Sequence, residues 1–142
     1  MNAHNRFTAS LTVAVLLALA PSAAWAAPSV IGKWLTDDGA AIIGISRCGK
    51  KVCGVIDRVL DPAAPKNDIN NPDARLRTEP LAGTYVLRDF VQSGSKWENG
   101  SVYDPKTGNT YRSNMELLDN GDLKVTGCVL FVCRSRVWTR PD

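Results

Sequence analysis

Gly32-Lys33-Trp34 opens the first β-like run of this sequence, and Trp138-Thr139-Arg140 ends the last one, two residues before the C-terminus. Between them, runs that alternate apolar and polar residues are separated by Gly, Asn, Asp and Pro, which is the pattern of short antiparallel strands. We therefore expect a sheet whose first and last strands meet. Arg140 would then stack on Trp34 in a cation–π contact worth roughly 0.5–2 kcal/mol and plug the bottom of a barrel.

Eight candidate strands follow from the alternation and the turn residues. Their expected ranges are 31–36, 40–47, 53–60, 83–91, 96–103, 109–118, 123–128 and 133–140. Short turns make successive strands antiparallel neighbours, and a long polar connection at 61–82 is the exception. Eight strands in such a meander close into a barrel without a sheet edge. The predicted fold is all-β: a single eight-stranded antiparallel up-and-down barrel in one domain spanning 27–142.

The first 26 residues read as a cleavable signal peptide. Arg6 supplies a positive n-region, residues 11–20 form an uncharged apolar run, and Ala24-Trp25-Ala26 fits a cleavage site. The apolar run is too short for a transmembrane anchor. We expect cleavage after Ala26 and a periplasmic or secreted mature protein with no integral membrane span.

The composition of the expected mature chain excludes several classes of function. Of 17 basic residues only Arg6 leaves with the signal peptide, so 16 basic and 14 acidic residues remain. This net charge of +2 is no footprint for nucleic-acid binding. The only histidine, His4, also leaves, which removes histidine-based catalysis and imidazole zinc sites. We predict no enzyme, no catalytic residue, no cofactor and no metal; a hydrolase using Glu98 or Glu116 has only residue type in its favour.

Four cysteines form two pairs with the same C-x4-C spacing, Cys48 with Cys53 and Cys128 with Cys133. An even number of cysteines in an exported chain indicates disulfides. A four-thiolate zinc site is the alternative, although structural zinc favours tighter pairs. Strand direction places the two pairs at opposite ends of the barrel, beyond the Cα separation of about 7 Å that a disulfide allows. We therefore predict that each pair braces its own hairpin.

The long connection carries an acidic stretch at 68–73, with Glu79 further along. This stretch lacks the sixth-position Gly of an EF-hand and has Pro72 at a ligand position, which excludes that motif. An irregular calcium site remains the alternative to a simple turn built by Asx residues before proline.

Two resemblances rest on these residues. Gly32-x-Trp34 with an Arg at the end of the last strand resembles the signature of lipocalins and related calycin barrels. A longer pattern resembles exported bacterial domain-of-unknown-function family 2147 over nearly the whole mature chain. This resemblance implies a lipocalin-like barrel, periplasmic or secreted, with no settled activity and no catalytic residue to carry over. The matching residues are Asp68, Asn71-Pro72, Arg75, Arg77, Pro80, Gly83, Trp97, Gly100, Tyr103-Asp104-Pro105, Gly108, Tyr111 and Trp138-Thr139-Arg140.

The top end of the barrel is the expected ligand site, because eight strands leave room for one small molecule. Asp37-Asp38, the 61–82 connection, the 104–108 turn and the apolar tip at 129–132 should surround its mouth. We expect aromatic and cationic side chains there to hold a small amphiphilic or aromatic ligand: Tyr85, Tyr103, Tyr111, Arg75, Arg77 and Phe131.

A filled barrel is the competing interpretation. The protein is then a structural or protein-interaction module that contacts a partner through the 61–82 connection and the 129–132 tip. Arg75 and Arg77 would in that case pair locally with Asp68, Asp73 or Glu79.

The sequence does not decide which face of the last strand points inward. One face carries Arg134, Arg136, Trp138 and Arg140, the other Ser135, Val137 and Thr139, and neither is cleanly apolar. Either a polar lumen or a basic outer stripe follows.

Overall fold

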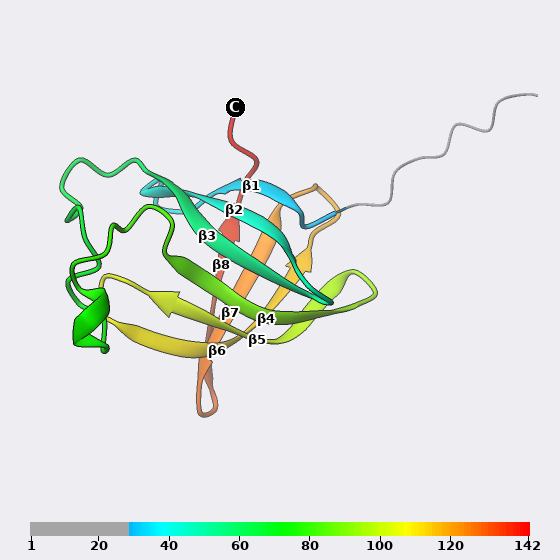
Figure 1. Ribbon diagram of the computed structural model, residues 1–142. Coiled ribbons are helices and arrows are strands. Elements are labelled where there is room, and N and C mark those ends of the chain that lie inside the picture. The colour runs from blue at the N-terminus through cyan, green and yellow to red at the C-terminus, as the bar shows by residue number, and fades with distance from the viewer. Residues whose placement is uncertain (1–28) are drawn as a thin grey trace, which may run out of the picture.

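The computed structural model describes residues 29–142, and the expected signal peptide lies outside them. Eight strands follow one another in sequence and in space as one antiparallel sheet (Figure 1). The predicted all-β meander is therefore confirmed. The strands are β1 (Gly32–Leu35), β2 (Ala41–Cys48), β3 (Lys51–Val59), β4 (Tyr85–Ser93), β5 (Lys96–Asp104), β6 (Asn109–Leu117), β7 (Leu123–Val129) and β8 (Val132–Trp138).

Most strand bounds differ from the expected ones by one or two residues, and the start of β3 shows a local reason. β3 begins at Lys51, before Cys53, because the β2–β3 turn needs only Gly49 and Lys50 and Gly49 takes a φ of 64°. The long connection stays irregular apart from one 3-10 turn, η1 (Ala74–Leu76).

The bottom half of the barrel is a packed apolar core. Trp34 is fully buried, and its indole Nε1 donates to the carbonyl oxygen of Val30 at 2.8 Å. Gly100 leaves room for the ring of Phe90, because a Cβ at that position would lie 2.5 Å from the ring carbons. These buried side chains fill the lower end of the barrel. The other large core side chains are Leu87, Trp97, Met115 and Leu123.

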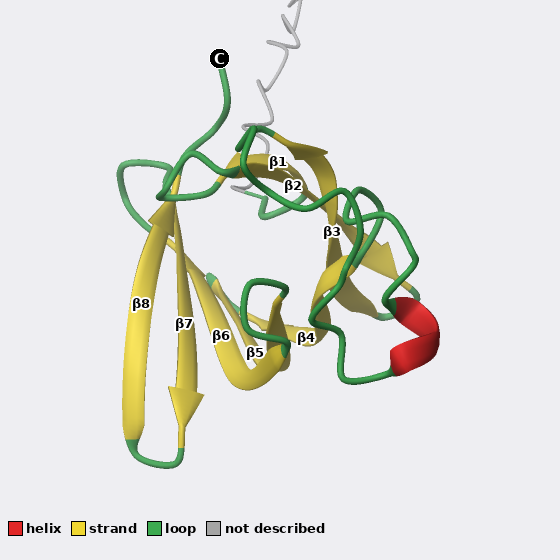
Figure 2. Cartoon of the chain, turned by 90° about the vertical axis from the view of Figure 1, so that its left-hand side faces the viewer, coloured by secondary structure: helices red, strands yellow, loops and turns green. Residues whose placement is uncertain are grey.

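The sheet closes on itself through a single backbone pair in the described chain. Leu35 N donates to Thr139 O at 2.8 Å, and Thr139 N donates to Leu35 O at 3.1 Å. β1 is short because the 36–40 turn begins directly after Leu35, where the Thr36 hydroxyl bonds to Ala41. Only one residue pair therefore joins the first and last strands, and the barrel is less completely closed than the sequence predicted. The β7–β8 hairpin projects away from β1 (Figure 2).

The register between β7 and β8 decides which face of β8 is inward. Arg136 lies opposite Val125, and Arg134 lies opposite Gly127. Residues directly opposite each other share a face of the sheet, and Val125 belongs to the buried core. Both arginines therefore face the interior, and the polar lumen is the correct alternative.

Both predicted disulfides are present. Cys48 is bonded to Cys53 across the β2–β3 turn, and Cys128 to Cys133 across the β7–β8 hairpin, with Cα separations of 5.9 and 4.1 Å. Two disulfides fit a protein of the periplasm or the extracellular space. Within residues 29–142, no helix is long and apolar enough to cross a membrane.

Candidate functional site

A cavity of about 1040 Å³ occupies the top half of the barrel. Its deep wall is apolar and includes Ile43, Ile56, Val86, Val102, Val125 and Trp138. An apolar interior with a few polar groups is typical of a small-molecule site. The top half is therefore not filled by side chains. Charged side chains also line this space: Asp37, Asp38, Asp61, Asp104, Lys106, Arg134 and Arg136.

Two ion pairs tie the β1–β2 turn to other elements around the mouth. Asp38 accepts from Lys106 Nζ of the β5–β6 turn at 2.7 Å, and Asp37 accepts from Arg136 of β8 at 3.1 Å. Burial alone would raise the pKa of Asp38, but hydrogen bonds from Lys106 and the Ala40 backbone lower it to about 2. The same bond to Asp38 raises the pKa of Lys106. Both partners are therefore charged at neutral pH.

The long β3–β4 connection is anchored at the mouth by a buried carboxylate. Asp68 is 1% exposed and accepts from the Tyr103 hydroxyl and from Asn71 Nδ2, each at 2.7 Å. Burial, followed by the bond to Asp68, raises the pKa of Tyr103 well above its usual range. The phenol therefore stays protonated and keeps donating to the carboxylate.

A second anchor joins this connection to the β5–β6 turn. Asn70 Nδ2 donates to the carbonyl oxygens of Pro105 and Lys106 at 3.0 and 3.1 Å. Gly108 lies against this segment with a φ of 74°, and a Cβ there would collide with the Asn70 carbonyl oxygen. The close approach and the positive φ together require glycine.

Arg134 differs from the other charged residues that line the cavity. Its guanidinium makes no hydrogen bond or ion pair within the described chain, whereas the side chains of Arg136 and Lys106 are paired with carboxylates. Asp61 and Asp104 each accept from a backbone N–H of their own turn. Neither carboxylate has an ion pair among the described residues, but Arg134 is the lining charge whose side chain makes no hydrogen bond either, and a guanidinium suits a carboxylate or phosphate.

Of the three tyrosines expected at the mouth, two line the cavity. Tyr103 and Tyr111 are part of its wall. Tyr85 does not line it and stacks with Arg88, whose guanidinium carbon is 4.4 Å from the ring centre. The cause is a bulge: Gly54 pairs with Leu87 and Val55 pairs with Tyr85, which leaves β4 with one extra residue.

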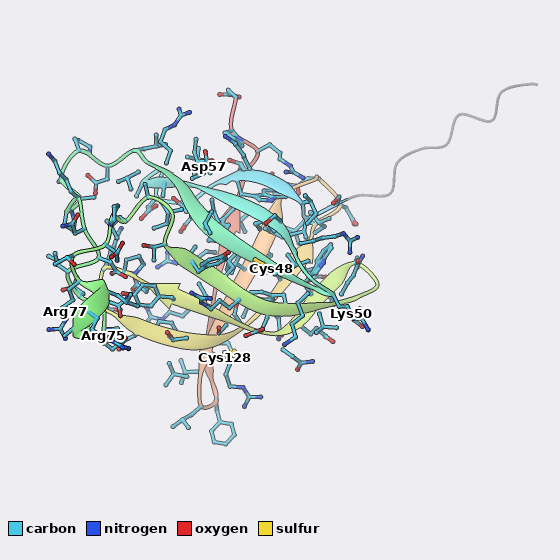
Figure 3. All side chains as sticks on the ribbon, in the orientation of Figure 1. Cys48, Lys50, Asp57, Arg75, Arg77 and Cys128 are labelled. Atoms are coloured by element: carbon cyan, nitrogen blue, oxygen red, sulfur yellow. A yellow bond between two sulfur atoms is a disulfide. The ribbon has the colours of Figure 1, made fainter. Side chains whose placement is uncertain are left out.

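The other expected ligand contacts lie outside the cavity lining. Arg75 pairs with Asp73 at 2.7 Å, and Arg77 Nε donates to the Asn71 carbonyl oxygen at 2.7 Å. Both extend from η1 at the margin of the molecule (Figure 3). Phe131 is 100% exposed at the β7–β8 tip.

The glutamates considered for catalysis lie outside the cavity. Glu98 and Glu116 do not line the cavity, and Glu116 pairs with Lys124 at 2.7 Å. The described residues contain no group of three or more His, Cys, Asp or Glu side chains that could hold a metal ion.

Sequence reasoning missed the cationic side chains that do line the cavity, namely Arg134, Arg136 and Lys106. The sequence contained one signal for the two arginines. They occupy every second position before Trp138, so they share a face of the strand with this apolar residue. The sequence contained no such signal for Lys106. Its position depends on the contact between the β5–β6 turn and the β1–β2 turn, which are far apart in the chain.

Residues 32–140 match the model of a family described as uncharacterized protein conserved in bacteria (DUF2147). The chain belongs to this family. Among solved structures it is similar to protein HP1028 of Helicobacter pylori, described as belonging to the lipocalin family. That similarity has 20% identity and a TM-score of 0.74 over 82% of this chain and 85% of that chain. Comparison with curated proteins found no match.

This DUF2147 member therefore has a lipocalin-like fold. At 20% identity, the similarity to HP1028 concerns the fold alone. Fold and family therefore establish the architecture, and the function has to be argued from the residues of the site.

Proposed function

We propose that this DUF2147 member binds one small anionic amphiphile, with its apolar part in the barrel and its anionic group at Arg134. The observation that carries the proposal is a large cavity with an apolar wall, lined by a guanidinium whose side chain has neither an ion pair nor a hydrogen bond among the described residues. Export to the periplasm or the medium, supported by the two disulfides, is part of the proposal.

The cavity wall suits the apolar part of such a ligand. Tyr111 and Trp138 contribute aromatic surface beside the aliphatic residues, and aromatic side chains add favourable stacking geometry to plain area burial. A ligand that covers this wall removes apolar surface from water, which is the main source of its affinity.

Arg134 supplies selectivity for the sign of the ligand's charge. A carboxylate or phosphate can accept two parallel hydrogen bonds from a guanidinium. A cationic headgroup would face Asp61 and Asp104, whose oxygens already accept turn hydrogen bonds. The proposal therefore assigns the ligand's charged group to the free guanidinium of Arg134 and not to these carboxylates.

Two fluorescent probes with the same aromatic skeleton test the proposal. 1-Anilinonaphthalene-8-sulfonate carries a sulfonate that N-phenyl-1-naphthylamine lacks, so their difference isolates the anionic group. We expect both to bind with enhanced fluorescence and the sulfonate to bind more tightly. Arg134→Gln should weaken sulfonate binding by about tenfold, the loss of one charged hydrogen-bonded contact, and leave the neutral probe unchanged.

Two variants serve as controls. Arg47→Gln removes the same charge from the exposed lower end of β2 and should affect neither probe. Gly127→Phe places a ring in the cavity beside Val102 and Tyr111 and should abolish binding of both. Equal binding by the Gly127→Phe variant, with its fold verified by circular dichroism, contradicts the cavity site. If neither probe binds, the result favours the alternative in which the protein is an interaction module with a filled barrel.

A further inference from the structure

The tip of the β7–β8 hairpin carries the two most exposed large apolar side chains among the described residues. Leu130 is 90% and Phe131 is 100% exposed, and Val129 and Val132 on either side are 53% and 67% exposed. The hairpin extends beyond the rest of the sheet, with Cys128 at its base (Figure 3). Leu130 and Phe131 are thus presented to solvent on a convex point, whereas Val129 and Val132 also border the cavity.

The hairpin holds this tip in a fixed shape. Cys128 and Cys133 are directly opposite each other and disulfide-bonded, and Val129 pairs with Val132 just above them. Leu130 has a φ of 51°, a conformation that non-glycine residues rarely adopt. Little conformational entropy is therefore left to lose when the tip becomes buried.

The surface around the tip is basic. Of the four basic residues between Leu123 and Arg140, Lys124 and Arg136 are ion-paired and Arg140 lies on Trp34 at the bottom of the barrel, so only Arg134 is both near the tip and free among the described residues. Arg112 of β6 lies opposite Cys128, and Arg134 lies two residues after Val132 on β8. Neither arginine has a carboxylate partner in the part of the chain that the structure describes. The charge around the tip is therefore complementary to an anionic surface.

We infer that the β7–β8 tip docks this protein onto the surface of an anionic phospholipid bilayer. Leu130 and Phe131 enter the boundary between headgroups and acyl chains, and Arg112 contacts the phosphates. A bilayer accepts a convex apolar point without a complementary cavity. A protein interface of standard size buries roughly 1,200–2,000 Å² and requires a far broader surface than this tip.

Cosedimentation with sucrose-loaded vesicles tests this inference. The probes are vesicles of phosphatidylcholine alone and of phosphatidylcholine with an equal part of phosphatidylglycerol. We expect the mature protein to sediment with the anionic vesicles only. Leu130→Ser/Phe131→Ser should weaken binding more than about tenfold, because two large apolar side chains no longer leave water. Arg112→Gln should weaken it about fivefold.

Two controls match these changes elsewhere on the molecule. Leu76→Ser removes another exposed leucine, 45% accessible in η1, and Arg47→Gln removes one exposed charge at the far end of β2. Both should bind vesicles like the unchanged protein. Absence of binding to anionic vesicles at low ionic strength, or equal binding by the tip variant, would overturn the inference.

The same variants separate this inference from ligand binding in the cavity. Leu130 and Phe131 do not line the cavity, so the tip variant should bind N-phenyl-1-naphthylamine normally. If analytical ultracentrifugation shows dimers that the tip variant abolishes, the tip is covered by a second copy and the bilayer assignment is wrong.

Discussion

The Arg140 side chain joins both ends of the chain at the bottom of the barrel. Its guanidinium carbon lies 3.8 Å from the centre of the Trp34 ring. The same group donates to the carbonyl oxygens of Ser29, Ile31 and Lys33 at 2.8 to 3.4 Å. Burial lowers the pKa of Arg140 from its ordinary value, yet the group stays charged at neutral pH. The contact therefore serves folding rather than ligand binding.

Gly32 is required by the position of Arg140. Its φ is 126°, and a Cβ there would lie 2.5 Å from an Arg140 guanidinium nitrogen. We expect Arg140→Ala to lower the free energy of unfolding by about 1–2 kcal/mol and Gly32→Ala by about 1–3 kcal/mol, measured by urea denaturation. In the Arg140→Ala background Gly32→Ala should cost less, because only the backbone strain remains. Strictly additive effects would show that the two residues do not interact.

Individual residues differ in how far their role follows from the sequence. The contact of Trp34 with Arg140 could be predicted, because alternation and strand count bring the chain ends together. The cavity position of Arg134 could not, since the eighth strand carries polar side chains on both faces and only its register with β7 decides.

Among the elements, the β3–β4 connection has the least regular structure. It has one turn of helix and is held at the mouth chiefly by Asp68 and Asn70. Asp68 has no cationic partner within 4.0 Å among the described residues, so its buried carboxylate relies on neutral donors. Loss of one donor leaves a buried acceptor oxygen unsatisfied.

Tyr103→Phe removes that donor with little change in volume. We expect it to lower the free energy of unfolding by about 1–3 kcal/mol and to speed tryptic cleavage after Arg75 and Arg77 in the loosened connection. Tyr85→Phe is the matched control, because Tyr85 is 41% exposed and its hydroxyl makes no hydrogen bond in the described chain. Equal effects of the two substitutions would refute the anchoring role of Asp68.

Strands and hairpin disulfides were predictable because they depend on residues close in sequence. Alternation, turn residues and the C-x4-C spacing act locally. The bulge that turns Tyr85 outward and the docking of Asn70 onto the β5–β6 turn depend on residues far apart in the chain, and neither leaves a periodic signal.

For the molecule as a whole, the mouth is tied by ion pairs from the β1–β2 turn. The pKa of Asp38 falls to about 2 from an ordinary value of 3.8. A carboxylate with a depressed folded-state pKa stabilises the fold above its unfolded pKa, and this contribution is lost as the pH falls through the folded pKa. The Asp38–Lys106 pair is thus formed at neutral pH and weakens on the acid side as the pH falls toward 2.

Asp38→Asn should therefore lower stability at neutral pH by a small amount, because the Asp38 side chain is 46% exposed. The difference between the variant and the unchanged protein should shrink as the pH falls from about 4 to about 2. Urea denaturation across this range measures it. Asp119→Asn, at a carboxylate with no ion pair among the described residues, is the control. A difference that stays constant with pH contradicts the assignment.

Apart from the Leu35–Thr139 pair, β1 and β8 are both edge strands with an unpaired margin in the described sheet, and β8 is the longer of the two. An unpaired strand margin is a template on which another chain can add and begin an aggregate. Inward-pointing charges are one way in which proteins prevent such growth, and β8 carries Arg134 and Arg136 in that position. The cationic lining of the cavity therefore also protects this protein from polymerising through its own unfinished sheet.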